Sequence, residues 1–197
     1  MNKYVIIKLL IVLSIISSLF LTLCSCGHNV IIKGIENFSP GDSEFSLCST
    51  LMPNHNFINQ YEYIEADYYY SDYCKDSCVG IGEEHVIIYF EYDEEIYNEA
   101  KDYCLSEFPL SEKNRVEYNG YVFIENVWLK EENDEPFDLE RFQMFIYNDG
   151  LNRLVFMGYK NMEDYFVSFS PEQSQNVLDD WETFLEQEFA EVYDFSK

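Results

Sequence analysis

An uncharged apolar stretch near the start of the chain limits which residues can belong to the fold. It runs from Leu9 to Leu23, behind Lys3 and Lys8, and spans about 15 residues. That length is usual for the apolar core of an export signal and short of the roughly 20 residues that a membrane-spanning helix needs. We therefore predict that residues 1–25 are a removable signal, which leaves 172 residues for the mature protein.

A cysteine motif closes this segment. In Leu23-Cys24-Ser25-Cys26, an aliphatic residue lies three positions before Cys26 and a small residue lies directly before it. The motif resembles the lipobox of bacterial lipoproteins, in which the cysteine receives a diacylglycerol and the chain is cut just before it. The resemblance implies lipidation at Cys26, since a cut before Cys24 would follow bulky Leu23. The alternatives are an ordinary secretory signal cut elsewhere, or an uncleaved anchor.

The resemblance implies a location and a domain plan. Two acyl chains give stable attachment, because each buried methylene contributes about 0.8 kcal/mol. We expect the protein on the extracytoplasmic face of the cell membrane, with the bilayer as its first partner. Residues 26–42 are expected to be the lipidated tether, which contains Pro40-Gly41, with a short strand at Val30–Lys33 as an alternative within it. Residues 43–197 are expected to form one acidic domain of ordinary size.

Charge restricts the partners of this domain. Two of the 12 basic residues and none of the 37 acidic residues lie in the signal, so the mature chain has a formal charge of −27. Nucleic acid is excluded, because its binding needs basic residues that displace phosphate counterions. A cationic partner, such as a basic protein or a divalent metal ion, would be attracted. Solubility and exclusion from an anionic cell envelope are the favoured explanation of this charge.

The hydrophobic pattern predicts a sheet built largely from hairpins. Asn119-Gly120 is the dipeptide that two-residue hairpin turns favour, and residues 148–152 give a second turn signal. Residues 61–73 alternate in a way that predicts one or two further strands. The remaining predicted strands are Val86–Tyr92, Arg115–Tyr118, Tyr121–Trp128, Phe142–Tyr147, Leu154–Tyr159 and Tyr165–Phe169.

Three segments carry helix signals. Ser170-Pro171-Glu172-Gln173 forms a capping box that predicts an amphipathic helix from Pro171 to about Glu191. A second helix is expected after Asp93 and before Pro109, and a shorter one over Glu44–Leu51. The predicted fold class is α+β: a single domain with an antiparallel sheet of about five to six strands, on which the C-terminal helix and one or two further helices pack.

Four cysteines remain after processing of the signal: Cys48, Cys74, Cys78 and Cys104. An even number outside the cytoplasm favours two disulfides. We favour bridges from Cys74 and Cys78 to Cys48 and Cys104, each of which would contribute roughly 3 kcal/mol. The alternatives are free buried thiols, or zinc bound by these thiolates or by Cys74 and Cys78 with a histidine, either His55 or His85.

Motifs for catalysis and cofactor binding are missing from the chain. HExxH, GxSxG, GxxxxGK and GxGxxG do not occur. His85 beside Glu83 and Glu84 would suit a base–carboxylate pair, although such a histidine is more often structural. The acidic runs 93–95 and 131–135 lack the ligand spacing of a calcium loop. We expect no enzyme activity, no cofactor and no metal site.

The expected role is that of a non-enzymatic binding or envelope-associated protein. Tyr61, Tyr63, Tyr68 and Tyr70 would suit a recognition face if they are exposed, although packing in the core and at its edge is the favoured interpretation. The body resembles small lipoproteins of Gram-positive bacteria in composition and in Tyr92-Asp93-Glu94-Glu95, which implies no activity. Two alternatives stay open: an envelope or carbohydrate hydrolase with paired carboxylates, and an acidic inhibitor of a basic partner.

Overall fold

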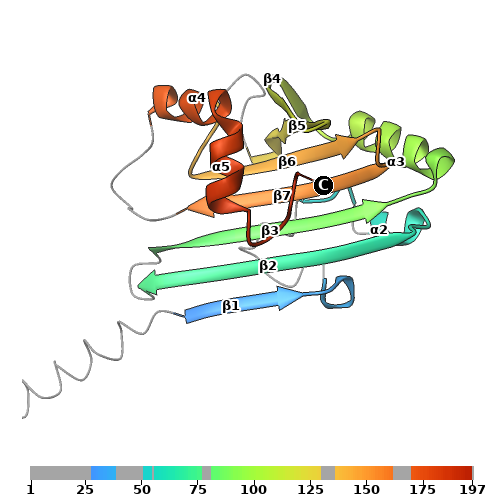
Figure 1. The fold of residues 1–197 in the computed structure, drawn as a ribbon, viewed down its shortest axis with the longest axis horizontal. Helices are drawn as coiled ribbons and strands as arrows, with labels where there is room; N and C mark the ends of the chain where they lie inside the picture. Colours follow the sequence, from blue (N-terminus) through green and yellow to red (C-terminus); the bar gives the residue numbers. More distant parts are fainter. Residues whose placement is uncertain are drawn as a thin grey trace, which may run out of the picture.

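A seven-stranded antiparallel sheet forms the centre of the molecule (Figure 1). The computed structural model describes residues 28–38, 51–54, 56–76, 81–129, 136–161 and 170–196. The strand order is β1-β2-β3-β7-β6-β5-β4, and every neighbouring pair runs antiparallel. The strands are β1 (His28–Lys33), β2 (Glu65–Asp76), β3 (Ile81–Glu91), β4 (Leu110–Tyr118), β5 (Tyr121–Asn126), β6 (Arg141–Asn148) and β7 (Arg153–Asn161). The predicted α+β class is confirmed, with one strand more than expected.

Both predicted hairpin turns are present. Asn119 and Gly120 have φ angles of 49° and 80°, the left-handed conformation that a two-residue turn between β4 and β5 requires. Between β6 and β7, the side-chain oxygen of Asn148 accepts hydrogen bonds from the backbone N–H groups of Gly150 (2.9 Å) and Leu151 (3.2 Å). These local bonds fix the register of the strands, and the register decides which side chains share a face.

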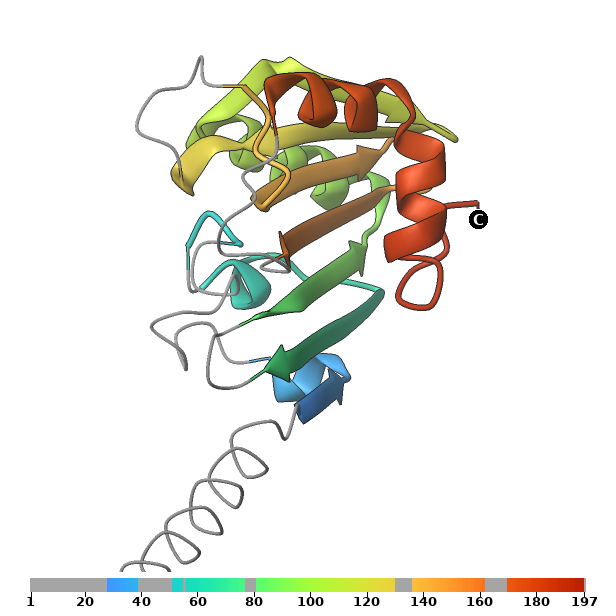
Figure 2. The ribbon, with the colours of Figure 1, turned by 90° about the vertical axis from the view of Figure 1, so that its left-hand side faces the viewer.

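The two faces of the sheet are covered by different helices (Figures 1 and 2). One face, here the α3 face, packs α2 (Phe57–Gln60) and α3 (Glu94–Glu107) against Val86, Ile88 and Phe90 of β3. The opposite face, here the α5 face, packs α4 (Pro171–Asp179), α5 (Trp181–Glu188) and the C-terminal tail. Successive side chains of a strand point to opposite faces, so the fully apolar run in β3 supplies both layers.

The helix predictions are confirmed for α3 and corrected near the C-terminus. α3 begins after Asp93 and ends before Pro109, as expected. The capping box is present, since Ser170 Oγ accepts from the Gln173 backbone N–H (3.3 Å) and Gln173 Oε1 accepts from that of Ser170 (2.7 Å). The single helix from Pro171 to Glu191 is wrong, because Asp180 (φ −126°, ψ 53°) leaves the helical conformation and separates α4 from α5. The break redirects the chain, and side chains of both helices reach the same apolar cluster.

Other predicted boundaries shift or lie outside the described residues. β1 begins at His28, so the sheet starts within the segment expected to be a tether. Residues 44–50 of the predicted short helix and the predicted strand Tyr165–Phe169 lie outside the described part of the chain, as do the signal and Cys26. None of the helices in the described ranges is long and apolar enough to cross a membrane.

Candidate functional site

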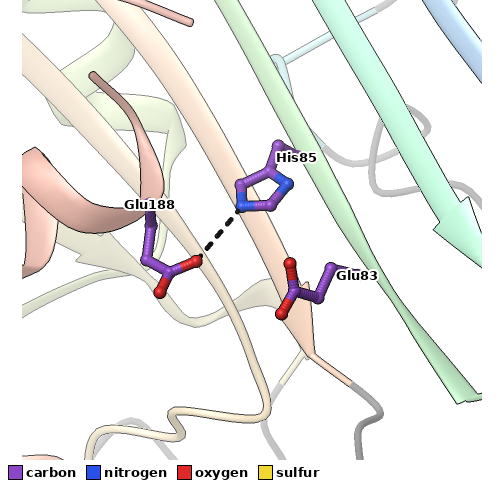
Figure 3. A group of neighbouring side chains, drawn as sticks. All are labelled: Glu83, His85 and Glu188. Carbon is purple, nitrogen blue, oxygen red and sulfur yellow. Dashed lines mark ion pairs between the residues drawn. The ribbon is translucent and has the colours of Figure 1, made fainter. Parts of the chain in front are cut away.

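Three side chains that could hold a metal ion converge at one end of the α5 face: Glu83, His85 and Glu188 (Figure 3). Glu83 and His85 are two residues apart on β3, so they point to the same side of the sheet. Glu188 is the last residue of α5 and faces them from the helix layer. One ligand atom from each residue lies within 4.8 Å of the other two. Each of the three residues is half-buried or buried.

The imidazole of His85 is held between aromatic rings. It is only 8% exposed, and it meets Tyr159 and Phe189 edge-on, with ring centroids 5.1 Å and 5.2 Å away. Its Nδ1 lies 3.5 Å from Oγ of Ser71, the residue opposite it on β2. Its Nε2 is buried and has no hydrogen-bond partner, although Glu188 Oε2 is 3.6 Å away. The ring is therefore positioned by packing, with one nitrogen directed at the two carboxylates.

The position of Glu188 makes its negative charge unfavourable. The C-terminal end of a helix carries the negative end of the helix dipole, and the last turn of α5 contains no basic residue. The Glu188 side chain is 29% exposed, so solvent screens its charge only partly. A positive charge between Glu188, Glu83 and His85 would offset this repulsion. A bound cation would supply such a charge.

Part of the Glu83–His85–Glu188 group could be noticed in the sequence. Glu83 and His85 directly precede the predicted strand Val86–Tyr92, and they were considered as a base–carboxylate pair, but only β3, which begins at Ile81, places both on one face. Glu188 carried no signal, because only the packing of α5 on the sheet brings it to His85. Glu84, the other acid considered, alternates to the opposite face of β3.

The four tyrosines considered as an alternative recognition face pack in the core of the α3 face or against it. Tyr68 is 5% exposed and is part of the buried cluster, so the recognition-face alternative is wrong for this residue. Tyr61, Tyr63 and Tyr70 are partly buried against the same cluster. Tyr61 packs on Phe57 with ring centroids 5.4 Å apart, and desolvation raises its pKa. Their side chains therefore lie in the core of the α3 face and at its edge.

Cys104 is a free thiol in the structure, which corrects the favoured disulfide pairing. It lies on the inner side of α3 and is 0% exposed, and burial raises its pKa well above the usual value. Cys48, Cys78 and His55 lie outside the described residues, and of Cys74 only the backbone, paired with His28 and Gly82, is described.

A second polar group joins the C-terminal tail to the sheet. Arg153 donates hydrogen bonds to Glu91 Oε2 (2.8 Å) and to Tyr193 Oη (3.0 Å), and its guanidinium lies 5.2 Å from the Tyr89 ring centroid. Burial raises the pKa of Tyr193, which therefore stays neutral at physiological pH. These contacts hold residues 189–196 on the α5 face. The role of the Arg153 group is therefore structural.

Comparison with known proteins returns no relative for this chain. No family model matches it, and neither a curated protein nor a solved structure matches it. Its function is therefore inferred from its own residues, beginning with the lipobox-like motif and the Glu83–His85–Glu188 group.

Proposed function

We propose that this chain is an exported lipoprotein, held on the extracytoplasmic face of a bacterial membrane through Cys26, whose body is a non-enzymatic binding domain. The observation that carries the proposal is the motif Leu23-Cys24-Ser25-Cys26 directly after an uncharged apolar stretch. The start of the sheet supports it: β1 begins at His28, two residues after Cys26. The first strand of the described residues therefore lies close to the N-terminus that lipoprotein processing would leave.

This short connection constrains how the body would sit on the membrane. Two residues span at most about 7 Å, so the β1 edge of the sheet would lie close to the lipid headgroups. The formal charge of −27 in the mature chain opposes wider contact with anionic lipids. The rest of the surface stays available to a partner, and the charge favours a cationic one.

A comparison of two cysteine substitutions tests the anchor. In a Gram-positive expression host given labelled palmitate, the wild-type protein and Cys24→Ala should incorporate label and sediment with membranes. Cys26→Ala should lose the label and leave the membrane fraction, because the acylated thiol is gone. Label in Cys26→Ala equal to that of the wild type would contradict the proposal, and so would recovery of the unlabelled full-length wild type from the cytosol.

A hydrolase with paired carboxylates is the second candidate, because Glu83 and Glu188 approach each other within 4.8 Å. Retaining glycosidases separate such groups by roughly 5 Å. The tyrosines that would line a sugar site in this hypothesis pack on the α3 face, however, whereas the two carboxylates lie on the α5 face. Hydrolysis of envelope polysaccharide by the wild type and not by Glu83→Gln would favour this candidate over the binding role.

A further inference from the structure

We propose that Glu83, His85 and Glu188 form a binding site for a divalent first-row transition-metal ion, with zinc as the best match. The ion would join the C-terminal end of α5 to β3. This site goes beyond the proposed lipoprotein function and does not depend on it, because lipidation at Cys26 and metal binding involve separate residues.

The donor geometry suits direct coordination. The distance from His85 Nε2 to Glu188 Oε2 is 3.6 Å, which is longer than a hydrogen bond. Two ligand atoms that each lie about 2.1 Å from a tetrahedral zinc ion are about 3.4 Å apart. The observed spacing is therefore close to that of two ligands on one ion. Figure 3 shows the Glu83 carboxylate facing the same space.

The buried nitrogen of His85 supplies a second, independent observation. Buried polar atoms in folded proteins nearly always have a partner, yet Nε2 of this 8% exposed residue has no hydrogen bond. The other ring nitrogen lies 3.5 Å from Ser71 Oγ. A proton on Nδ1, directed at that hydroxyl, leaves the lone pair of Nε2 available to a metal ion, the arrangement usual for metal-binding histidines.

The local charge favours a dication. Two carboxylates and the negative end of the α5 dipole surround the position that the ion would take. A dication at this position would be attracted by both carboxylates and by the helix end. The acidic body also raises the local concentration of cations.

The ligand types decide which metals fit. Calcium and magnesium prefer oxygen ligands, and magnesium requires near-octahedral geometry. An imidazole with two carboxylates suits zinc and the neighbouring first-row ions, among which zinc binds more tightly than manganese or iron. Three protein ligands leave one position of a tetrahedral ion for water, as in open zinc sites.

Calorimetric titration of zinc into the purified, detergent-solubilised protein tests the site. Metal is first removed with chelator, and accessible thiols are alkylated so that cysteines do not compete. We expect one zinc ion per chain, at least 100-fold weaker binding in Glu188→Gln, and a change below threefold in the matched control Glu186→Gln. Glu186 is an exposed acid of the same helix, so the control removes the same charge without removing a ligand.

Two further measurements test the metal site even if one of the variants folds poorly. Cobalt should give the visible spectrum of nitrogen and oxygen ligands, without the thiolate charge-transfer band that cysteine ligands would add. Zinc should raise the melting temperature of the wild type and of Glu186→Gln but not that of Glu83→Gln, which tests the site from the strand side. Absence of binding in the wild type, or equal zinc affinity in Glu188→Gln, would overturn the proposal.

Discussion

The two faces of the sheet are built from the same strands, but they carry different side chains at their ends. On the α3 face, rings and a buried thiol fill the layer, with Phe156 and Cys104 both 0% exposed. The α5 face is equally apolar at its centre, where Trp181 stacks on Phe184 with ring centroids 5.0 Å apart. At the C-terminal end of α5 this apolar layer gives way to the Glu83–His85–Glu188 group. The described part of the α3 face is thus filled by packed rings and a thiol, whereas the α5 face carries an imidazole between two carboxylates at the end of its helix.

The largest expected effects come from the centres of the two layers. Phe156→Ala removes a ring that packs on Phe57, Phe108 and Phe145, and Trp181→Ala removes the anchor of α5. Each should lower the free energy of unfolding by about 3–5 kcal/mol, because a large cavity is left in a packed core. Urea denaturation measures this loss.

The rate at which the Cys104 thiol is labelled shows which of these two variants loosens the α3 face. Thiol labelling in native buffer should speed up in Phe156→Ala, because the cavity adjoins the α3 layer that covers Cys104. It should change much less in Trp181→Ala. Trp128→Ala, at a side chain that is 52% exposed, is the control for loss of a large ring and should change stability by less than about 1 kcal/mol. Equal labelling in both core variants would mean that the faces open as one unit, and the comparison would fail.

A smaller effect is expected at the start of the α4–α5 layer. Ser170→Ala removes the capping bond to the Gln173 backbone N–H and should cost about 1 kcal/mol. Ser106→Ala, an exposed serine in the last turn of α3, serves as the matched control and should cost less. Equal losses in urea denaturation would show that the capping box does not stabilise the α5 face.

The smallest effect concerns the contact between α3 and the β6–β7 turn. Asp149 accepts hydrogen bonds from Lys101 Nζ (2.7 Å) and Tyr97 Oη (2.6 Å), and the Lys101 bond is the main cause of its lowered pKa. Asp149→Asn should lose only about 0.2–1 kcal/mol at pH 7, because the Asp149 side chain is 65% exposed and solvent screens the pair.

The pH dependence of the Asp149 contribution to stability follows from the lowered pKa of this carboxyl. A carboxyl whose pKa is lower in the folded state stabilises the fold above its unfolded pKa of about 3.9, and that contribution is lost as the pH falls through the folded pKa. The stability difference between wild type and Asp149→Asn should therefore shrink between pH 5 and pH 2 in urea titrations. Asp102→Asn, at an exposed acid of α3, is the control. A difference that stays constant over this range would exclude the ionic contribution.

Local sequence rules predicted the elements whose causes are local. The hairpin at Asn119-Gly120, the capping box at Ser170 and the start of α3 after Asp93 each depend on residues within a few positions of one another. The single C-terminal helix failed, because an apolar pattern that continues past Asp180 does not reveal a change of direction made to fit the sheet. The Cys104 bridge failed for a related reason, since cysteine count says nothing about which thiol a core will enclose.

The α+β class, the antiparallel hairpins and the acidic charge can be read from the amino-acid sequence, because they follow from periodicity, turn chemistry and composition. The burial of Tyr68 in a core and the contact between Glu188 and His85 became visible in the folded structure alone. The physical reason is that a face or a site is formed by residues distant in sequence, and packing of the helices on the sheet selects which of the many acids and tyrosines come together.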